Sequence, residues 1–252
     1  MLKVENVIAG YLAGSRVLDG FSMEMKKGEV VALLGRNGMG KTTFLKALMG
    51  HVAISQGSML FDGQELAGKK PYEIARMGMG YVPQGRDIFS DFTVEENLRM
   101  GLLGHPGKSK DIPDWAFDLF PILRERRTQR AGSFSGGQQQ QLAIVRALIA
   151  KPKLLLLDEP SEGIQPSIVQ DIGRVLSDIA KEQGLTILLV EQNMELVLGM
   201  AQPCSWKTVK WFMKQTKCRR CAMTRRPFIS TCRSRFLRSN KWNLQLNWAW
   251  TP

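Results

Sequence analysis

Residues 35–43 read GRNGMGKTT, and the architecture of the whole chain can be deduced outward from this segment. It matches the pattern G-x-x-x-x-G-K-[ST], in which glycines let backbone N–H groups turn toward phosphate oxygens. The apolar run VVALLG precedes the loop and the helix-patterned KTTFLKALMG follows it, so a helix N-terminus adds its positive end at the same place. The sequence therefore predicts a loop that binds the phosphates of a nucleotide, through Gly35, Arg36, Asn37, Gly38, Met39, Gly40, Lys41, Thr42 and Thr43.

The run LLLLDEP, which ends in two carboxylates, supplies the second half of the expected site. Lys41 is expected to reach the β- and γ-phosphates, and the Thr42 hydroxyl to ligate Mg²⁺. Asp158 follows four apolar residues and can hold the same Mg²⁺ from the carboxyl edge of a sheet, where ligands of open α/β folds gather. Glu159 is then the candidate that polarises the attacking water. An acidic pair after a strand is by itself more often a turn, but beside a phosphate loop it predicts hydrolysis.

Unalternating apolar runs at residues 30–35, 154–158 and 186–190 predict strands buried on both faces of a parallel sheet. Stretches with apolar residues at helical spacing lie between them, so the fold class is α/β. Residues from about 86 to 145 are more polar and predict an inserted helical subdomain. No apolar run reaches the roughly 18 residues that span a bilayer, and no leader peptide is recognisable, so we expect a soluble intracellular protein.

The segment SFSGGQQQQLAIVRAL resembles the signature motif of ABC ATPases. The resemblance covers nearly all of residues 1–200 and implies a P-loop NTPase (RecA-like) core with an antiparallel β subdomain and an inserted α-helical subdomain. It implies that ATP is held between two cassettes, with the signature motif of one facing the phosphate loop of the other. It also implies that Tyr11 stacks on adenine and that Gln84, in GYVPQGRDIF, reaches the Mg²⁺ and the attacking water. The signature residues are Ser135, Gly136, Gly137 and Gln138.

Two positions depart from the family pattern. Gln165 stands where most ABC ATPases carry the aspartate of the D-loop, and Gln192 stands where they carry a switch histidine. A glutamine amide can still donate to a γ-phosphate oxygen or orient water, but it cannot take a positive charge. We therefore expect Gln192 to permit hydrolysis at a weaker site, and a second, different ATPase subunit to be the partner.

Within the family, YVPQGRDIF, TVEENL and LLVEQN resemble the ATPases of branched-chain amino acid importers. The stretches IPDWAFDLFPIL, SGGQQQQLAI and DEPSEGIQPSIVQDIGRVL look more like the urea or short-amide subgroup. The resemblance implies an ATPase subunit on the cytoplasmic face of a membrane permease, which an external solute-binding protein supplies. We expect the solute to be urea or a short amide, with import of a branched-chain amino acid as the alternative. A non-transport ABC ATPase and a non-enzymatic nucleotide- or nucleic-acid-binding module are further alternatives, and no nucleic-acid partner is expected.

The segment 201–252 differs in composition from the rest. It holds 12 of the 35 Lys and Arg residues and none of the 23 Asp and Glu residues, so residues 1–200 carry no net charge. One interpretation is a four-cysteine zinc site formed by Cys204, Cys218, Cys221 and Cys232, but such sites normally contain two C-x-x-C pairs and only Cys218 and Cys221 form one. A basic tail on a membrane surface is a second interpretation. A third is a frameshift near residues 203–205, because codons read one nucleotide earlier permit MENGKVVYEANKM, with an N-G hairpin signal. We favour the frameshift and expect a poorly ordered tail.

Overall fold

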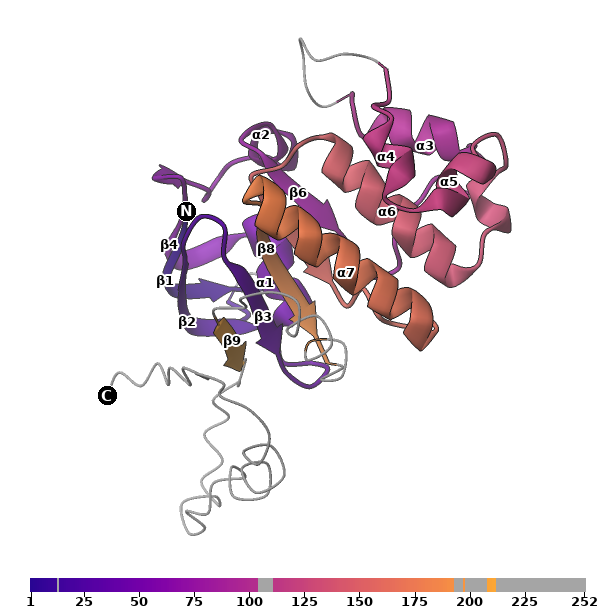
Figure 1. Ribbon diagram of the computed structural model, residues 1–252. Helices are drawn as coiled ribbons and strands as arrows, with labels where there is room; N and C mark the ends of the chain where they lie inside the picture. The colour runs from indigo at the N-terminus through magenta and orange to yellow at the C-terminus, as the bar shows by residue number, and fades with distance from the viewer. Residues whose placement is uncertain (13, 104–110, 193–196, 198–207, 212–252) are drawn as a thin grey trace.

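The computed structural model describes residues 1–12, 14–103, 111–192, 197 and 208–211 (Figure 1). Its strands are β1 Leu2–Ala9, β2 Leu18–Met25, β3 Val30–Leu34, β4 Ile54–Phe61, β5 Gln64–Glu65, β6 Met79–Val82, β7 Leu154–Asp158, β8 Thr186–Glu191 and β9 Thr208–Trp211. Its α-helices are α1 Lys41–Leu48, α2 Pro71–Arg76, α3 Val94–Met100, α4 Trp115–Asp118, α5 Pro121–Glu125, α6 Gly136–Ile149 and α7 Pro166–Gln183. A short 3₁₀ turn, Ala131–Ser133, precedes α6.

A five-stranded sheet in the order β6-β7-β8-β3-β9 forms the centre of the fold. Every pairing in it is parallel, so the carboxyl ends of β3, β6, β7 and β8 meet at one edge. The three strands that the apolar runs predict are β3, β7 and β8, and the helices expected between them are α1, α6 and α7. These sequence predictions are confirmed.

The parallel sheet is buried on both faces, which explains why its strands read as continuous apolar runs. In β3, Val30, Ala32 and Leu34 join a core cluster that also contains residues of α6 and α7. Val31 and Leu33 point the other way, into a cluster with residues of α1 and of the antiparallel strands. The phosphate loop is therefore held between two packed layers.

A second, antiparallel sheet has the order β2-β1-β4-β5. The burial of β1 alternates, with Leu2, Val4, Val7 and Ala9 buried, because only one face of this sheet packs on the core. Figure 1 shows β1, β2 and β4 at one end of the molecule, and α3, α4 and α5 gathered beside α6 at the other.

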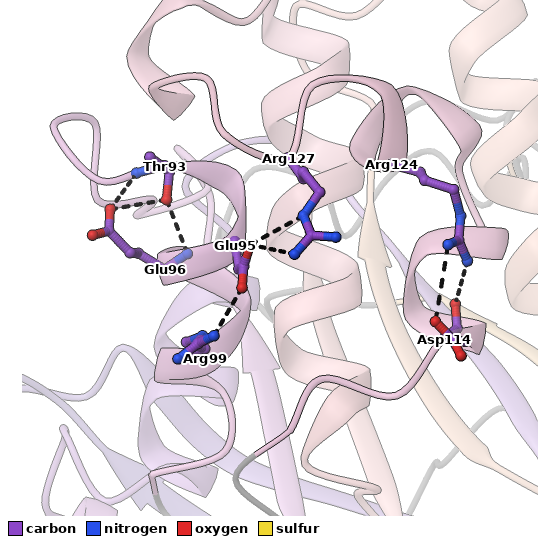
Figure 2. Close-up of polar contacts among 7 residues, drawn as sticks. All are labelled: Thr93, Glu95, Glu96, Arg99, Asp114, Arg124 and Arg127. Atoms are coloured by element: carbon purple, nitrogen blue, oxygen red, sulfur yellow. Dashed lines mark hydrogen bonds and ion pairs between the residues drawn. The ribbon is translucent and has the colours of Figure 1, made fainter.

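Ion pairs join the short helices that precede α6 (Figure 2). Thr93 and Glu96 form a capping box that starts α3, with Thr93 Oγ1 accepting from the Glu96 N–H at 3.2 Å. Glu95, also in the first turn of α3, pairs with Arg99 Nη2 at 2.8 Å and with Arg127 Nη2 at 2.9 Å. Glu95 therefore ties α3 to the segment after α5. The boundaries of about 86 and 145 for a helical subdomain stay a prediction.

Within 201–252 the structure describes only Thr208–Trp211, where β9 runs parallel to β3. The four cysteines, and almost all of the segment to which the frameshift, zinc and membrane-surface interpretations apply, lie outside the described residues. In the part of the chain that the structure describes, no helix is long and apolar enough to cross a membrane.

Candidate active site

The phosphate loop links the end of β3 to the start of α1. Gly38 and Gly40 have φ values of 79° and 95°, which side-chain-bearing residues rarely adopt. A Cβ on Gly40 would also lie 3.2 Å from the Val17 carbonyl oxygen. The local sequence therefore needs glycine here, and the resulting turn places the first N–H groups of α1 at the carboxyl edge of the sheet.

Lys41, the first residue of α1, is 4% exposed and points back into this loop. Its Nζ donates to the carbonyl oxygens of Gly35 at 2.8 Å and Arg36 at 3.2 Å. It also forms an ion pair with Glu159 Oε1 at 3.1 Å. The contact brings opposite charges together in a buried setting, which offsets part of the cost of removing each from water.

Asp158 ends β7 with its side chain 1% exposed. Thr42 Oγ1 donates to Asp158 Oδ1 at 3.1 Å, and the Tyr81 hydroxyl donates to Oδ2 at 3.3 Å. Burial raises the pKa of Asp158 to about 6, although the hydrogen bond from Thr42 opposes the shift. Burial, with the nearby Asp158 charge, likewise raises the pKa of Tyr81, which stays a hydrogen-bond donor at neutral pH. A cation bound beside this carboxylate would favour its ionised form.

Glu159 follows directly and lies in the left-handed region, with φ of 46°. Its N–H donates to the Val190 carbonyl oxygen at 2.9 Å, which holds this unfavourable backbone against the end of β8. Lys41, Thr42, Asp158 and Glu159 are thus brought together, as the sequence predicts. The set can bind phosphate, hold a hard cation and offer a carboxylate to water.

Gln84 lies after β6, and its side chain points to a neighbouring loop. Gln84 Nε2 donates to Glu162 Oε2 at 2.9 Å, and Arg86 Nη2 donates to the Glu162 carbonyl oxygen at 3.2 Å. In turn Arg146 of α6 donates to the Asp87 carbonyl oxygen at 2.7 Å. The structure therefore places Gln84 beside the loop that follows Glu159, and ties both to α6.

The two departures from the family pattern differ in their setting. Gln192 follows β8 with an exposed side chain, and its N–H donates to Glu191 Oε2 at 3.0 Å. Gln165 is the N-cap residue of α7, and its side chain makes no capping hydrogen bond. Gln192 lies at the carboxyl edge of the sheet, where Asp158 ends β7, whereas Gln165 lies at the start of α7, after the loop that follows Asp158.

The signature residues open α6 as a capping box. The Ser135 N–H donates to Gln138 Oε1 at 3.0 Å, and Ser135 Oγ accepts from the Gln138 N–H at 3.4 Å. A Cβ on Gly137 would lie 2.5 Å from Ile168 of α7, so glycine permits the two helices to approach. These residues contact each other and their neighbours on α7 and around Arg86, and not the phosphate loop of the same chain among the described residues.

Tyr11 lies close to the phosphate loop with 57% of its surface exposed. Thr43 Oγ1 donates to the Tyr11 hydroxyl at 3.4 Å, and Lys46 Nζ lies 5.9 Å from the ring centroid. The ring is thus exposed beside the start of α1, where a base attached to a bound phosphate chain can reach it.

Sequence reasoning missed three contacts of this site, those of Tyr81, Glu162 and Glu191. Tyr81 and Glu191 are polar residues in mostly apolar strands, and this is the signal that could have drawn attention to them. Glu162 lies in a loop and carries no such signal.

Comparison with known proteins agrees with this geometry. Residues 18–162 match the protein family described as ABC transporter. The chain is 46% identical over 195 residues to the high-affinity branched-chain amino acid transport ATP-binding protein BraG of Pseudomonas aeruginosa, covering 77% of this chain and 83% of that relative. It is 35% identical over 202 residues to the probable branched-chain amino acid transport ATP-binding protein LivF of Archaeoglobus fulgidus, covering 80% and 85%.

Solved structures resemble the fold. A nucleotide-free ATP-binding cassette from an ABC transporter superposes with a TM-score of 0.69 at 29% identity, over 79% of this chain and 84% of that chain. A dimeric cassette bound to ADP and phosphate superposes with a TM-score of 0.71 at 21% identity, over 79% and 91%, and supports the fold alone. The predicted α/β P-loop NTPase fold is confirmed. The chain belongs to the ATP-binding subunits of ABC transporters, and it is an ATPase of that family.

Proposed function

We propose that this chain hydrolyses ATP with Mg²⁺ to drive import of a solute through a membrane permease. The observation that carries the proposal is the meeting of two pairs at one edge of the sheet. Lys41 Nζ contacts Glu159 Oε1 at 3.1 Å, and Thr42 Oγ1 contacts Asp158 Oδ1 at 3.1 Å. The pair of Lys41 and Glu159 supplies a cation that can bind phosphate and a carboxylate that can activate water. The pair of Thr42 and Asp158 supplies two oxygen ligands for a metal ion.

The donor set at Thr42 and Asp158 fits Mg²⁺. Both are hard oxygen ligands, and Mg²⁺ is commonly held by one or two protein oxygens together with substrate phosphates. The raised pKa of Asp158, about 6, fits a carboxylate that a cation stabilises. Gln84 would join these ligands only after its side chain leaves Glu162, which it contacts at 2.9 Å. The ion would neutralise charge that develops on the phosphates.

The chain's own residues would act around the nucleotide as follows. Backbone N–H groups of residues 35–43 and Lys41 bind the phosphates, and Tyr11 packs on the base. Glu159 accepts a proton from water, while Gln192 orients that water or donates to the γ-phosphate. Residues 135–138 present the N-terminus of α6, a helix of 14 residues, to the ATP of another cassette.

The partner proposed for that second cassette is a different ATPase subunit, because Gln192 cannot take the charge of a histidine. The two would dock on permease subunits at the cytoplasmic face of the membrane, and a solute-binding protein would act on the other side. Residues 1–200 would carry all of these functions, and residues 201–252 none.

The named relatives favour a branched-chain amino acid as the solute, since both BraG and LivF carry that description. Urea or a short amide is a second candidate, and the stretches at residues 112–123 and 158–176 favour it. In the proposed transport the solute passes through the permease, so uptake must be measured to choose between the two.

The test is uptake of radiolabelled leucine and of radiolabelled urea by cells that lack the native subunit and produce this chain. Uptake of one solute with the unaltered chain, lost with Glu159→Gln, supports import and identifies the class. If cells with the unaltered chain and cells with Glu159→Gln take up each solute at the same rate, the proposal is contradicted. Glu182→Gln, on the exposed face of α7, is the matched control.

A further inference from the structure

Glu191 is a buried carboxylate at the last position of β8, with only 2% of its surface exposed. Its two oxygens accept from two different loops. Oε1 accepts from the Ser161 N–H at 3.0 Å, and Oε2 accepts from the Gln192 N–H at 3.0 Å. Burying a carboxylate is costly unless its charge is satisfied, so these contacts hold the loops firmly.

Both loops belong to the active site. Ser161 follows Glu159 by two residues, and Gln192 is the switch position. The preceding residue of β8, Val190, accepts from the Glu159 N–H at 2.9 Å. The end of β8 thus holds the backbone of the loop that carries Glu159 and of the loop that carries Gln192, the two residues proposed to act on the attacking water.

We propose that Glu191 is a positioning residue for ATP hydrolysis, whose carboxylate fixes Gln192 relative to Glu159 by bonding the loops that carry them. The proposal rests on the role given above to Gln192. Turnover depends on sub-ångström placement of the groups around the attacking water, whereas ATP binding depends on the phosphate loop. Glu191 therefore affects kcat and leaves the KM for ATP nearly unchanged.

Glu191→Gln is the main test, in the full-length chain. Glutamine has one acceptor oxygen and one NH₂ group, so it can accept from Ser161 or from Gln192 but not from both. We expect kcat to fall about tenfold, with the KM for ATP within about twofold. In a Gln192→Ala background the same substitution should lower kcat by less than about twofold, because Glu191 acts through Gln192.

Thr186→Val is the matched control. Thr186 is buried at the other end of β8, and its Oγ1 accepts from the Gly28 N–H at 3.0 Å. This variant also loses a buried contact between a side chain and the backbone, and it should lower stability without changing kcat. An equal loss of kcat in both variants would show that Glu191 acts only through stability, and would overturn the proposal.

Amide hydrogen exchange tests the placement without relying on activity. In Glu191→Gln, the amide of Ser161 or of Gln192 should exchange at least about tenfold faster, and in Thr186→Val neither should change. Unchanged protection of both amides, or a loss of kcat that is equally large when Gln192 is alanine, would overturn the proposal. If Glu191→Gln does not fold, Glu191→Asp serves, because its shorter carboxylate cannot reach both loops. Loss of hydrolysis in Glu159→Gln tests the ATPase function separately.

Discussion

Lys41 Nζ lies 3.1 Å from Glu159 Oε1, and their side chains are only 3% and 10% exposed. The residue proposed to bind phosphate is therefore paired with the residue proposed to activate water. Bound ATP must share or replace this contact, because its phosphates attract the same ammonium group. In the proposed function, the pair links nucleotide binding to the release of the Glu159 carboxylate.

Lys41→Ala should abolish ATP binding and also destabilise the chain by about 3 kcal/mol, because it leaves the Glu159 carboxylate buried without a cation. Adding Glu159→Gln to Lys41→Ala should recover at least about 1 kcal/mol, since the unpaired charge is then gone. Urea unfolding of the single and double variants measures both quantities. A double variant that is less stable than Lys41→Ala would show that the pair does not act in this way.

Asp158→Asn should stabilise the chain at pH 8 in the absence of Mg²⁺ and nucleotide. The pKa of Asp158 is raised from 3.8 to about 6, so the folded state binds its proton more tightly than the unfolded state. Stability therefore falls as pH rises from about 4 to 6, and at pH 8 the charged carboxylate costs on the order of 2 kcal/mol. The amide avoids this cost.

Urea unfolding between pH 4 and pH 8 measures the difference between Asp158→Asn and the unaltered chain. It should shrink as pH falls below about 6 and be small near pH 4. Asp178→Asn, on the exposed side of α7, should show no such trend. A gain in stability that is independent of pH would be at odds with the burial of Asp158 as its cause.

Tyr81→Phe should raise the Mg²⁺ concentration needed for half-maximal hydrolysis by about fivefold. The variant loses the hydroxyl that donates to Asp158 Oδ2 at 3.3 Å, so the carboxylate is less well oriented toward the metal. Hydrolysis at saturating Mg²⁺ should change little. Tyr72→Phe, at an exposed tyrosine of α2, is the control, and the same Mg²⁺ dependence in both variants would refute the positioning role.

Glu95→Gln should destabilise the chain by about 1 kcal/mol at pH 7, because Glu95 pairs with both Arg99 and Arg127 (Figure 2). The destabilisation is modest because the side chains of Arg99 and Arg127 are 61% and 55% exposed. Hydrogen bonds from Arg99 and Arg127 lower the pKa of Glu95 below its usual 4.5. The stabilisation is therefore present above about pH 4.5 and is lost as pH falls through the lowered value.

Thermal unfolding at pH 7 and at pH 3 checks this direction. The difference between Glu95→Gln and the unaltered chain should be largest at pH 7 and should decrease toward pH 3. Glu125→Gln, at an exposed position of α5, should leave the melting temperature unchanged. An equal loss at both pH values would mean that the ion pairs do not contribute.

The parts of the fold nearest the phosphate loop could be predicted from sequence, and the reason is local. β3, β7 and β8 are buried on both faces, so each reads as an unbroken apolar run. Asp158 ends β7 and Glu159 follows it, while Lys41 opens the helix that the phosphate loop joins to β3. The antiparallel sheet came only from family resemblance, because the alternation in β1 is interrupted between Glu5 and Ile8.

Contacts between distant segments could not be predicted in this way. Tyr81 meets Asp158 because β6 pairs with β7, and Gln84 meets Glu162 in the loops that follow these strands. The period of each segment does not reveal the order of the strands. The sequence can therefore show that Tyr81 is a polar residue in a strand, but not that its partner is Asp158. Glu191 was overlooked for a related reason, since its partners are backbone N–H groups of loops.

The most direct test of the central claim is phosphate release from ATP by the full-length chain and by Glu159→Gln, with Glu182→Gln as the control. The unaltered chain and Glu182→Gln should release phosphate when Mg²⁺ is present, and Glu159→Gln should be slower by at least about 100-fold. Its affinity for ATP should be unchanged or higher, because Lys41 loses a competing partner. Hydrolysis by Glu159→Gln at the rate of the unaltered chain would contradict the account.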